Sequence, residues 1–313
     1  MTLHASGATP GARRSGPGGG TADGTAGDGA GEGPARDGVG EGPARDGAGD
    51  RAGDGASGAT RGPDAEETGA EETGGHHGPV VRWFDPSGPA GALRPPAAGE
   101  PALWLVRVAE HAPYAAAVAG GVLDAAERGR AGAFVRAADR DRYRVAHLAL
   151  RLLLGGYLDT EPRAVELVRE PCPRCGGPHG RPAVSAGAPH FSLSHTGDLV
   201  LLAFADLPVG ADVEEWPEER TVREVSAALH PGERAELAAL PAGARRAAFA
   251  RCWTRKEAHL KGTGAGLSGG LAATYTGTGP VPAPIPGWTL TDVPVPPGHA
   301  AACAVRREPP GAR

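Results

Sequence analysis

Residues 191–215 read FSLSHTGDLVLLAFADLPVGADVEE and contain three candidate strands separated by turn residues. Polar and apolar side chains alternate in 191–194, while 199–204 and 209–213 are rich in aliphatic residues. Such patterns are typical of strands, and the sequence His-Thr-Gly-Asp at 195–198 is typical of a tight turn. The stretch therefore predicts a strand meander.

Helical patterns lie on both sides of this meander. Apolar side chains recur at three- and four-residue spacing in three segments, 122–134, 138–158 and 244–261. A further helical stretch opens at Pro231, and Gly262 is expected to close the last helix. Two more strands are expected, a buried one at 101–110 and an edge or terminal one at 299–305.

The expected elements mix helices with antiparallel strands and lack strict strand–helix alternation, so the predicted fold class is α+β. We expect two halves, at 79–205 and 206–307, followed by a short tail at 308–313. Residues 1–78 consist almost entirely of Gly, Ala, Asp, Glu, Arg, Ser, Thr and Pro, with short repeats. Since such a segment has almost no large apolar side chains to bury, we predict that it is disordered.

The composition of the 313-residue chain argues against several functional classes. Its formal net charge of -5 disfavours a broad nucleic-acid surface. No apolar run approaches the roughly 20 residues that span a bilayer, and the start of the chain lacks a signal-peptide pattern, so we expect a soluble cytoplasmic protein. Four cysteines are too few for a disulfide scaffold in a chain of this length.

Two acids lie one residue apart in the sequence Gly-Ala-Asp-Val-Glu at 210–214. On a strand this spacing puts the Asp212 and Glu214 side chains on one face, where their charges repel unless a cation neutralises them. Mg2+ fits, because it binds one or two carboxylates together with phosphate oxygens and water. The alternative is an exposed strand end, which is the stronger interpretation of this motif taken alone.

An acid and a base follow on the helix expected at 244–261. Four-residue spacing aligns four side chains in one stripe, those of Phe249, Trp253, Glu257 and Lys261. The two charged side chains therefore emerge at the rim of a buried face. The alternative is an ordinary helical ion pair between Glu257 and Lys261, worth only ~0.3 kcal/mol.

Ser194 and His195 lie where a strand enters the expected turn. A hydroxyl and an imidazole at this place can donate hydrogen bonds to a phosphate. The alternative is a hairpin turn in which Ser194 and Thr196 cap backbone amides.

A second metal motif occurs in the loop ahead of the meander. Cys172, Cys175 and His179 look like half of a zinc site, but structural zinc sites have four ligands. A further cysteine, Cys252, falls within a predicted helix. We therefore expect a structural loop here, with zinc binding left open.

Together these motifs resemble the signature of the Sfp-type 4'-phosphopantetheinyl transferases. The family patterns are a Ser/Thr-His-Ser/Thr-Gly turn, a Gly-x-Asp-x-Glu strand and a Trp-x-x-Lys-Glu-Ala/Ser-x-x-Lys helix, and they occur here in that order at 194–197, 210–214 and 253–261. Upstream, 134–151 and 180–182 also match family features, so the resemblance covers about 100–307. It implies two similar α/β halves in a pseudo-twofold arrangement.

The resemblance also implies roles for individual residues. The magnesium ligands would be Asp212, Glu214 and Glu257. The catalytic pair would be Glu257 and Lys261, with Lys261 at the pyrophosphate and with Glu257 or a metal-held water as the base for the carrier serine. The residues that contact coenzyme A would be Asp212 and Lys261 and, at its adenosine and 3'-phosphate end, Arg142, Arg181, Ser194 and His195. In the family's upstream basic cluster this chain offers only Arg130.

The implied reaction moves 4'-phosphopantetheine from coenzyme A to a serine of an apo carrier protein, with Mg2+ as cofactor and 3',5'-adenosine bisphosphate as the leaving group. Expected partners are acyl or peptidyl carriers of fatty-acid, polyketide or nonribosomal peptide synthases, and we expect a monomer that binds neither nucleic acid nor membrane. The alternative is a non-catalytic protein of the same fold that binds coenzyme A or a carrier. Such a protein would have no need of the metal and leaving-group residues.

Overall fold

The computed structural model describes residues 79–87, 93–266 and 270–308. The predicted disorder of 1–78, and all but the first residue of the tail predicted at 308–313, lie outside these ranges. In the described part, none of the helices combines the length and the apolar character that crossing a bilayer requires.

The described chain begins with β1 (Val81–Trp83) and β2 (Ala102–Arg107), followed by the helices α1 (Val108–Val122), α2 (Ala125–Ala133) and α3 (Ala137–Leu158). The 3-10 helix η1 (Pro162–Ala164) and the small pair β3 (Leu167–Arg169) and β4 (Pro182–Val184) come next. The central strands are β5 (His190–Thr196), β6 (Leu199–Ala205) and β7 (Val209–Glu215). The last elements are α4 (Glu219–Ser226), α5 (Pro231–Ala239), α6 (Ala242–Thr263), β8 (Trp288–Asp292) and β9 (His299–Arg306).

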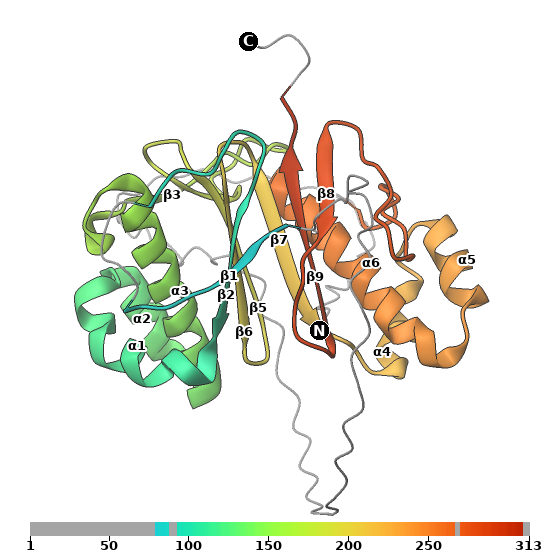
Figure 1. The fold of residues 1–313 in the computed structure, drawn as a ribbon, viewed down its shortest axis with the longest axis horizontal. Helices are drawn as coiled ribbons and strands as arrows, with labels where there is room; N and C mark the ends of the chain where they lie inside the picture. The colour runs from blue at the N-terminus through green and yellow to red at the C-terminus, as the bar shows by residue number, and fades with distance from the viewer. Residues whose placement is uncertain (1–78, 88–92, 267–269, 309–313) are drawn as a thin grey trace, which may run out of the picture. The chain divides into compact units, whose positions relative to one another are not determined.

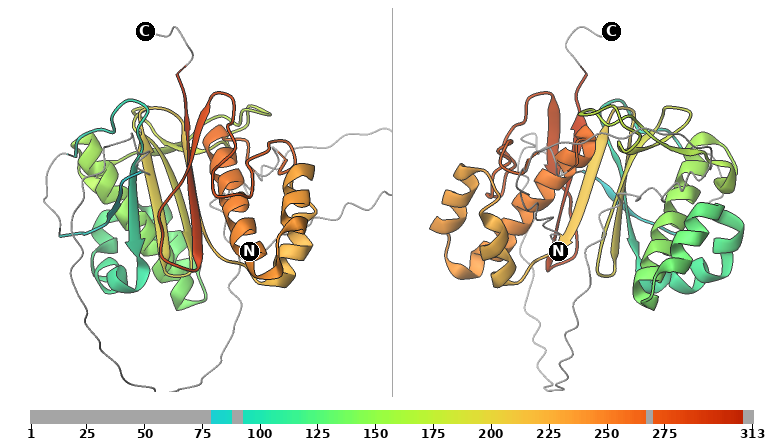
Figure 2. Two further views of the ribbon diagram at one scale, coloured as in Figure 1. Left: turned by 45° about the vertical axis from the view of Figure 1, so that its right-hand side comes forward. Right: turned by 180° about the vertical axis from the view of Figure 1, so that it is seen from behind.

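Two sheets pack face to face between two groups of helices (Figures 1 and 2). The first sheet has the strand order β1-β2-β6-β5, and the second has the order β7-β9-β8. Helices α1 and α3 cover the outer face of the first sheet, while α6 covers the outer face of the second, with α4 and α5 beyond it. Helices and sheets are mixed as the predicted α+β class requires. Each sheet uses strands from one predicted half, but the domain boundaries and the pseudo-twofold relation remain predictions.

Alternating side chains let each strand contribute to two cores. In β7, Ala211 and Val213 pack between the two sheets. Because successive side chains of a strand point to opposite faces, Asp212 and Glu214 lie together on the α6 side. The side chains of β2 and β6 alternate in the same way, between the core shared by the sheets and the core under α1 and α3.

The predicted meander is only partly right. Strands β5 and β6 form the expected antiparallel hairpin, but β7 pairs with β9 in the second sheet, because the turn at 206–208 carries the chain from one sheet to the other. The strand expected at 299–305 as an edge or terminal strand is the last strand of the chain, but it does not lie at the edge of its sheet. β9 is the central strand of its sheet, and its small apolar side chains are buried on both faces, as is typical of a covered strand.

Two helix boundaries also differ from the prediction. The strand expected at 101–110 ends at Arg107, and α1 follows at once, in an Ala- and Gly-rich segment with little amphipathic pattern. Helix α6 continues through Gly262, which was expected to close it, and ends at Thr263. Its C-cap is Gly264, which has the left-handed conformation (φ 73°).

Glycine at two positions lets α6 lie directly on β7. A Cβ atom at Gly210 would be 2.0 Å from the carbonyl oxygen of Ala258 and 2.3 Å from the backbone nitrogen of Gly262. A Cβ atom at Gly262 would be 2.7 Å from the Trp288 ring. Backbone atoms of a buried helix cannot move aside as a flexible side chain can. The absence of a side chain at Gly210 is therefore what allows α6 to lie so close to β7.

We predict that Gly210→Ala destabilises the protein by about 3 kcal/mol or more, because its methyl group overlaps the backbone of α6. Urea unfolding followed by circular dichroism measures this change. The control is Gly120→Ala on an exposed position of α1, where a Cβ atom meets nothing within 4 Å. The free energy of unfolding of that variant should be unchanged or higher by about 0.5–1 kcal/mol. Equal stability of the two variants would contradict the tight helix–strand contact.

Candidate active site

Helix α6 and strand β7 bring a base and an acid together beside β5. Lys261 Nζ donates to Asp212 Oδ1 at 2.7 Å and to Ser194 Oγ at 2.9 Å. Ser194 Oγ in turn donates to the same Asp212 oxygen at 2.8 Å. The Asp212 side chain is 4% exposed and that of Lys261 is 30% exposed. The cluster is therefore reached from solvent on the side of the lysine.

Alternate hydroxyl side chains of β5, those of Ser192, Ser194 and Thr196, line the junction with β7, and we call them the hydroxyl seam. Ser192 Oγ accepts a hydrogen bond from the backbone N–H of Ala211 at 2.9 Å, and Ser194 bonds Asp212. These bonds tie the edge strand of the first sheet to the edge strand of the second.

Only part of the hydroxyl seam was predicted. Ser194 bonds a carboxylate and does not cap a backbone amide, so the hairpin alternative is wrong for this residue. Thr196 Oγ1 accepts from the Glu215 N–H and also donates to Glu214 Oε2, both at 3.4 Å. Ser192 was missed. The signal that points to it is a hydroxyl at every second position of a strand.

Burial makes ionisation of the carboxylates around Lys261 costly. Burial, followed by the charge of Asp212, raises the pKa of Glu214 to about 8 and the pKa of Glu257 to about 7. Burial alone would lower the pKa of Lys261, but Asp212 outweighs it, so the pKa of Lys261 is raised. Lys261 thus stays charged near two acids, Glu214 and Glu257, that hold protons near neutral pH.

Two carboxylate oxygens of this cluster, Asp212 Oδ2 and Glu257 Oε1, are buried without a hydrogen-bond partner. An unsatisfied buried polar group costs roughly 1–3 kcal/mol, and a bound cation would satisfy both oxygens. The ligand oxygens of Asp212, Glu214 and Glu257 do not all lie within 4.8 Å of one another. Lys261 is bonded to Asp212 in this arrangement.

The partner of Lys261 bears on the helical ion-pair alternative. Its ion pair is with Asp212 on β7 and not with Glu257 one turn earlier on α6. An ordinary surface pair within the helix therefore does not describe this lysine.

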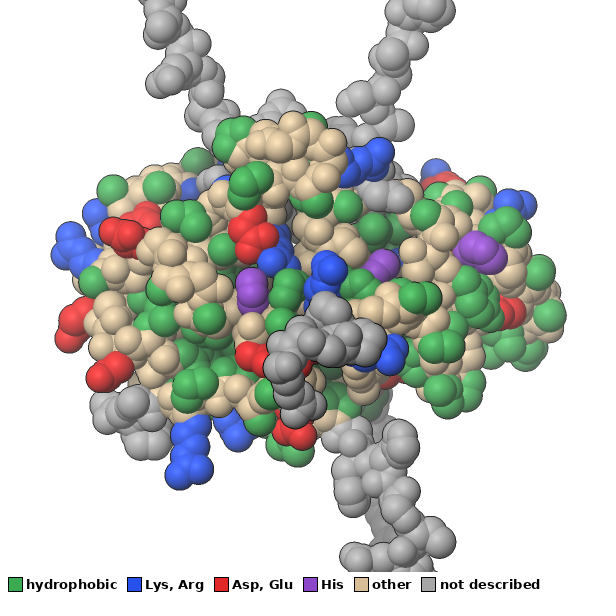
Figure 3. Space-filling view, turned by 90° about the horizontal axis from the view of Figure 1, so that it is seen from above, with side chains coloured by type: hydrophobic (Ala, Val, Ile, Leu, Met, Phe, Trp, Pro, Cys, Tyr) green, Lys and Arg blue, Asp and Glu red, His purple; other side chains and the backbone are tan. Residues whose placement is uncertain are grey.

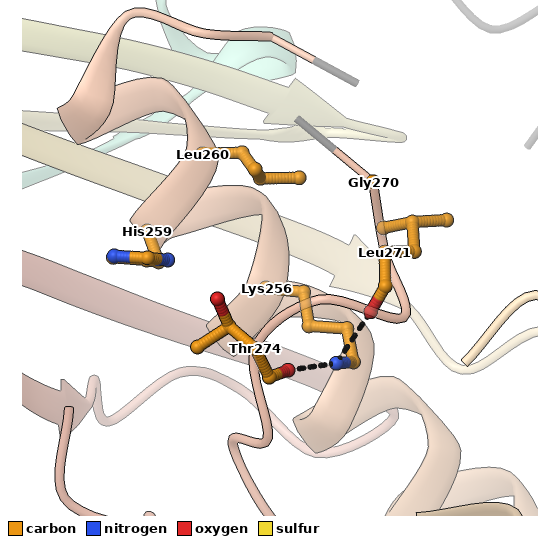
Figure 4. A pocket seen from close by; sticks show the side chains of 6 residues that line it. All are labelled: Lys256, His259, Leu260, Gly270, Leu271 and Thr274. Carbon is orange, nitrogen blue, oxygen red and sulfur yellow. Dashed lines mark hydrogen bonds between the residues drawn. The ribbon is translucent and has the colours of Figure 1, made fainter. Parts of the chain in front are cut away.

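A second lysine of α6 has a different role. Lys256 lines the small pocket in Figure 4, where its Nζ donates to the carbonyl oxygens of Leu271 and Thr274 at 2.7 and 2.5 Å. It also pairs with the fully buried Glu233 at 2.7 Å. Lys256 therefore braces the chain that follows α6, and no donor is left for a ligand.

Two candidate residues for coenzyme A lie at the β5–β6 hairpin. Arg142 of α3 donates to the carbonyl oxygen of Gly197 at 2.8 Å and pairs with Asp139 at 2.9 Å. Burial, followed by the charges of Arg142 and Lys261, lowers the pKa of His195 to about 4. At pH 7 the His195 ring is thus neutral and can offer an N–H but not a positive charge.

Arg181 lies at the C-terminal end of α6. It makes two hydrogen bonds to Glu170, at 2.7 and 2.9 Å, and one to the carbonyl oxygen of Gly262 at 3.0 Å. Figure 3 looks onto the end of the sheets where α6 terminates, and basic, acidic and histidine side chains gather near its centre. Arg130 lies elsewhere, on α2, with its guanidinium 5.2 Å from the centre of the Phe134 ring.

The loop between β3 and β4 gathers a separate set of metal-binding side chains. The ligand atoms of Cys172, Cys175 and His179 all lie within 4.8 Å of one another, and this is the one such group of three found in the described residues. Cys175 Sγ and His179 Nε2 are 3.0 Å apart. The structural loop expected from the sequence stays a prediction.

Comparison with known proteins points to one family. A sequence model of the 4'-phosphopantetheinyl transferase superfamily matches residues 208–294, which include the acids of β7 and the charged residues of α6. The 4'-phosphopantetheinyl transferase AcpT of Salmonella typhimurium is 40% identical over 124 residues, 39% of this chain and 59% of the relative. The 4'-phosphopantetheinyl transferase HetI of Nostoc sp. is 31% identical over 152 residues, 47% of this chain and 61% of the relative.

A phosphopantetheinyl transferase of Thraustochytrium sp. is 30% identical over 201 residues, 58% of this chain and 67% of the relative. The chain spans about three fifths of the length of the first curated relatives that it matches.

The raised pKa of Glu214 gives a pH-dependent stability in protein free of divalent cations. The unfolded chain loses the Glu214 proton near pH 4.5, before the folded protein loses it near pH 8, so stability falls as pH rises through this window. Glu214→Gln removes this titration. We expect it to raise Tm by at least about 3 °C at pH 8, with a gain that shrinks toward pH 5.

Differential scanning fluorimetry at several pH values measures these shifts. Glu218→Gln, at an exposed acid just before α4, is the matched control and should change Tm by the same small amount at every pH. If Glu214→Gln behaves like this control, Glu214 titrates normally.

Proposed function

Since the chain belongs to the 4'-phosphopantetheinyl transferase superfamily, we propose that it transfers the 4'-phosphopantetheine arm of coenzyme A to a serine of an apo carrier protein. The observation that carries this proposal is the cluster of Lys261, Asp212 and Ser194 beside two unpartnered carboxylate oxygens. Such a cluster combines a fixed cation with acids suited to a divalent ion, which is what a pyrophosphate substrate requires.

In this reaction the serine oxygen of the carrier forms a bond to the β-phosphorus of coenzyme A. The bond from that phosphorus to the bridging oxygen breaks, and 3',5'-adenosine bisphosphate leaves with the electron pair. Charge neutralisation at the phosphates is the main demand of such a transfer. Lys261, which is held at Asp212 and reached from solvent, is placed to contact the pyrophosphate and to stabilise the charge that develops on the leaving group.

The serine proton has two acceptors in this proposal, the Glu257 carboxylate and a water held at the acids. Glu257 Oε1 is buried and unpartnered, so it is free to accept a hydrogen bond from an incoming hydroxyl. In Glu257→Gln the amide keeps the size of the side chain but can neither take the proton nor supply a negative charge to the metal.

Asp212, Glu214 and Glu257 are the residues that would hold Mg2+, and the unpartnered oxygens of Asp212 and Glu257 fit such an ion. When bound, Mg2+ supplies positive charge to the pyrophosphate oxygens. A cation there would favour the ionised forms of Glu214 and Glu257, whose pKa values are raised by burial and, after it, by the charge of Asp212.

The adenosine and 3'-phosphate end of coenzyme A is assigned to two places. Arg142 and His195 lie together at the β5–β6 hairpin, where the neutral imidazole and the guanidinium can donate to a phosphate. Arg181 lies at the end of α6. Its bonds to Glu170 position the guanidinium. Substitution of Arg181 tests whether it contacts coenzyme A.

The proposed partners are coenzyme A and carrier proteins or carrier domains of fatty-acid, polyketide or nonribosomal peptide synthases, modified by a monomer in the cytoplasm. A non-catalytic protein that binds coenzyme A or a carrier is the alternative. The pairing of buried Asp212 with Lys261, beside the unpartnered oxygen of Glu257, disfavours it, because binding alone does not require such a group.

Loss of the charge of Glu257 or of Lys261 on α6 should abolish transfer without unfolding the protein. We expect Lys261→Ala and Glu257→Gln each to lower the rate of transfer by about a hundredfold or more, because each removes a charge at the phosphates or the metal. Mass spectrometry of apo carriers incubated with coenzyme A and Mg2+ detects the added arm. Circular dichroism checks the fold.

The matched control is Arg220→Ala, which breaks an exposed i,i+4 ion pair with Glu224 on α4. It should leave transfer nearly unchanged, since surface pairs contribute at most about 1 kcal/mol. A double variant, Glu257→Lys with Lys261→Glu, keeps both charges but exchanges their places. If it retained near-normal transfer, the site assignment would be wrong.

Mg2+ should raise the Tm of the wild-type protein at pH 8, because binding to the folded state alone stabilises it. Asp212→Asn should lose most of this rise, whereas Glu218→Gln should keep it. Thermal scans with Mg2+ and with EDTA give the comparison. A rise of the same size in all three proteins would place the binding of Mg2+ outside the cluster.

A further inference from the structure

We propose that Cys172, Cys175 and His179 bind one zinc ion, separate from the site for Mg2+, which fixes the loop between β3 and β4. Their ligand atoms already lie within 4.8 Å of one another, and the Cys175 and His179 side chains are exposed to solvent. Two sulfur atoms and one imidazole nitrogen are a set that zinc prefers. A water molecule completes the coordination on the exposed side.

The backbone of this loop is already shaped around the sulfur atoms. The Cys172 N–H donates to the carbonyl oxygen of Gly177, and the Gly176 N–H donates to the carbonyl oxygen of Cys172, both at 2.8 Å. Gly176 has a φ of 72°, which lets the chain turn back between the second cysteine and the histidine. The turn holds its ligands in place before any ion binds.

A second observation comes from the space beside the ligands. A Cβ atom at Gly177 would lie 3.1 and 3.2 Å from two ring atoms of His179 and 3.4 Å from Cys175 Sγ. A larger residue at 177 would therefore crowd the His179 ring, which would have to shift by a few tenths of an ångström. The glycine keeps both side chains close enough for one ion to join them.

The chemistry keeps this ion apart from the proposed magnesium site. Thiolate and imidazole ligands favour zinc, whereas the acids of β7 and α6 present only oxygen, which favours Mg2+. When zinc binds, the two thiols release their protons to solvent and the sulfur atoms bind as thiolates. No redox step is involved.

The place of the loop gives the ion a positioning role. Pro173, between the two cysteines, lies beside Gly264 at the end of α6, since a Cβ atom there would be 3.7 Å from the proline ring. Arg181, two residues after His179, donates to Gly262 on the same helix end. A zinc ion that fixes the loop thus fixes the start of the segment that carries Arg181.

Metal analysis of untagged, full-length protein tests the proposal. After dialysis against metal-free buffer, we expect close to one zinc per chain, and Cys175→Ser and His179→Ala should each lower the zinc content at least tenfold. Both residues are exposed, so their replacement should leave the fold intact. The matched control, Cys303→Ala, removes a buried cysteine of β9 and should keep the zinc.

Two further readouts keep the test independent of purification history. Protein stripped of metal and given Co2+ should show a thiolate-to-cobalt charge-transfer absorption, which Cys175→Ser weakens. Zinc should also slow cleavage by trypsin after Arg174, between the two cysteines. Absence of zinc, absence of the cobalt signal, or a Cys172–Cys175 disulfide in the purified protein would each overturn the proposal.

Transfer to an apo carrier is measured on the same samples. An inactive protein that binds zinc through these residues leaves the zinc site standing and sinks the proposed transferase function. An active protein without zinc sinks only the zinc site.

Discussion

The backbone contact between Gly210 and α6 places the two sources of charge in one site. Strand β7 carries two of the acids, and α6 carries the third acid and the lysine, so their separation depends on how closely the helix lies on the strand. A side chain at 210 would collide with the backbone of Ala258 and Gly262. The ion pair from Lys261 to Asp212 spans this contact, and it forms because no Cβ atom keeps the two elements apart.

The charged cluster is balanced by groups from three elements. Asp212 is nearly inaccessible to solvent, and it is tolerated because Lys261 from α6 and Ser194 from β5 both donate to it. Glu214 and Glu257 have weaker compensation, and their raised pKa values record this. Acids with strongly raised pKa values are more common at catalytic and binding sites than elsewhere in proteins.

Much of this arrangement could be predicted from local patterns. The strands near 191–205 and 209–213, the long helix that ends near Lys261, and the shared face of Asp212 and Glu214 all follow from periodicities of two and 3.6 residues. The transfer of β7 to a second sheet could not be predicted, because a short turn looks the same whether the next strand pairs with its neighbour or leaves it. The Gly210 contact and the partner of Lys261 depend on residues about 50 positions apart in the sequence.

The core between the two sheets contains several alanines among its leucines and valines, namely Ala203, Ala205, Ala211 and Ala301. The volume of these side chains helps to set the distance between the two sheets. Ser194 belongs to one sheet and Asp212 to the other, so their hydrogen bond depends on how the two sheets are placed. Replacing one of these alanines by a bulkier residue would alter the geometry around Lys261 without touching any charged group. The geometry of the active site therefore depends partly on core methyl groups that do not contact the substrate.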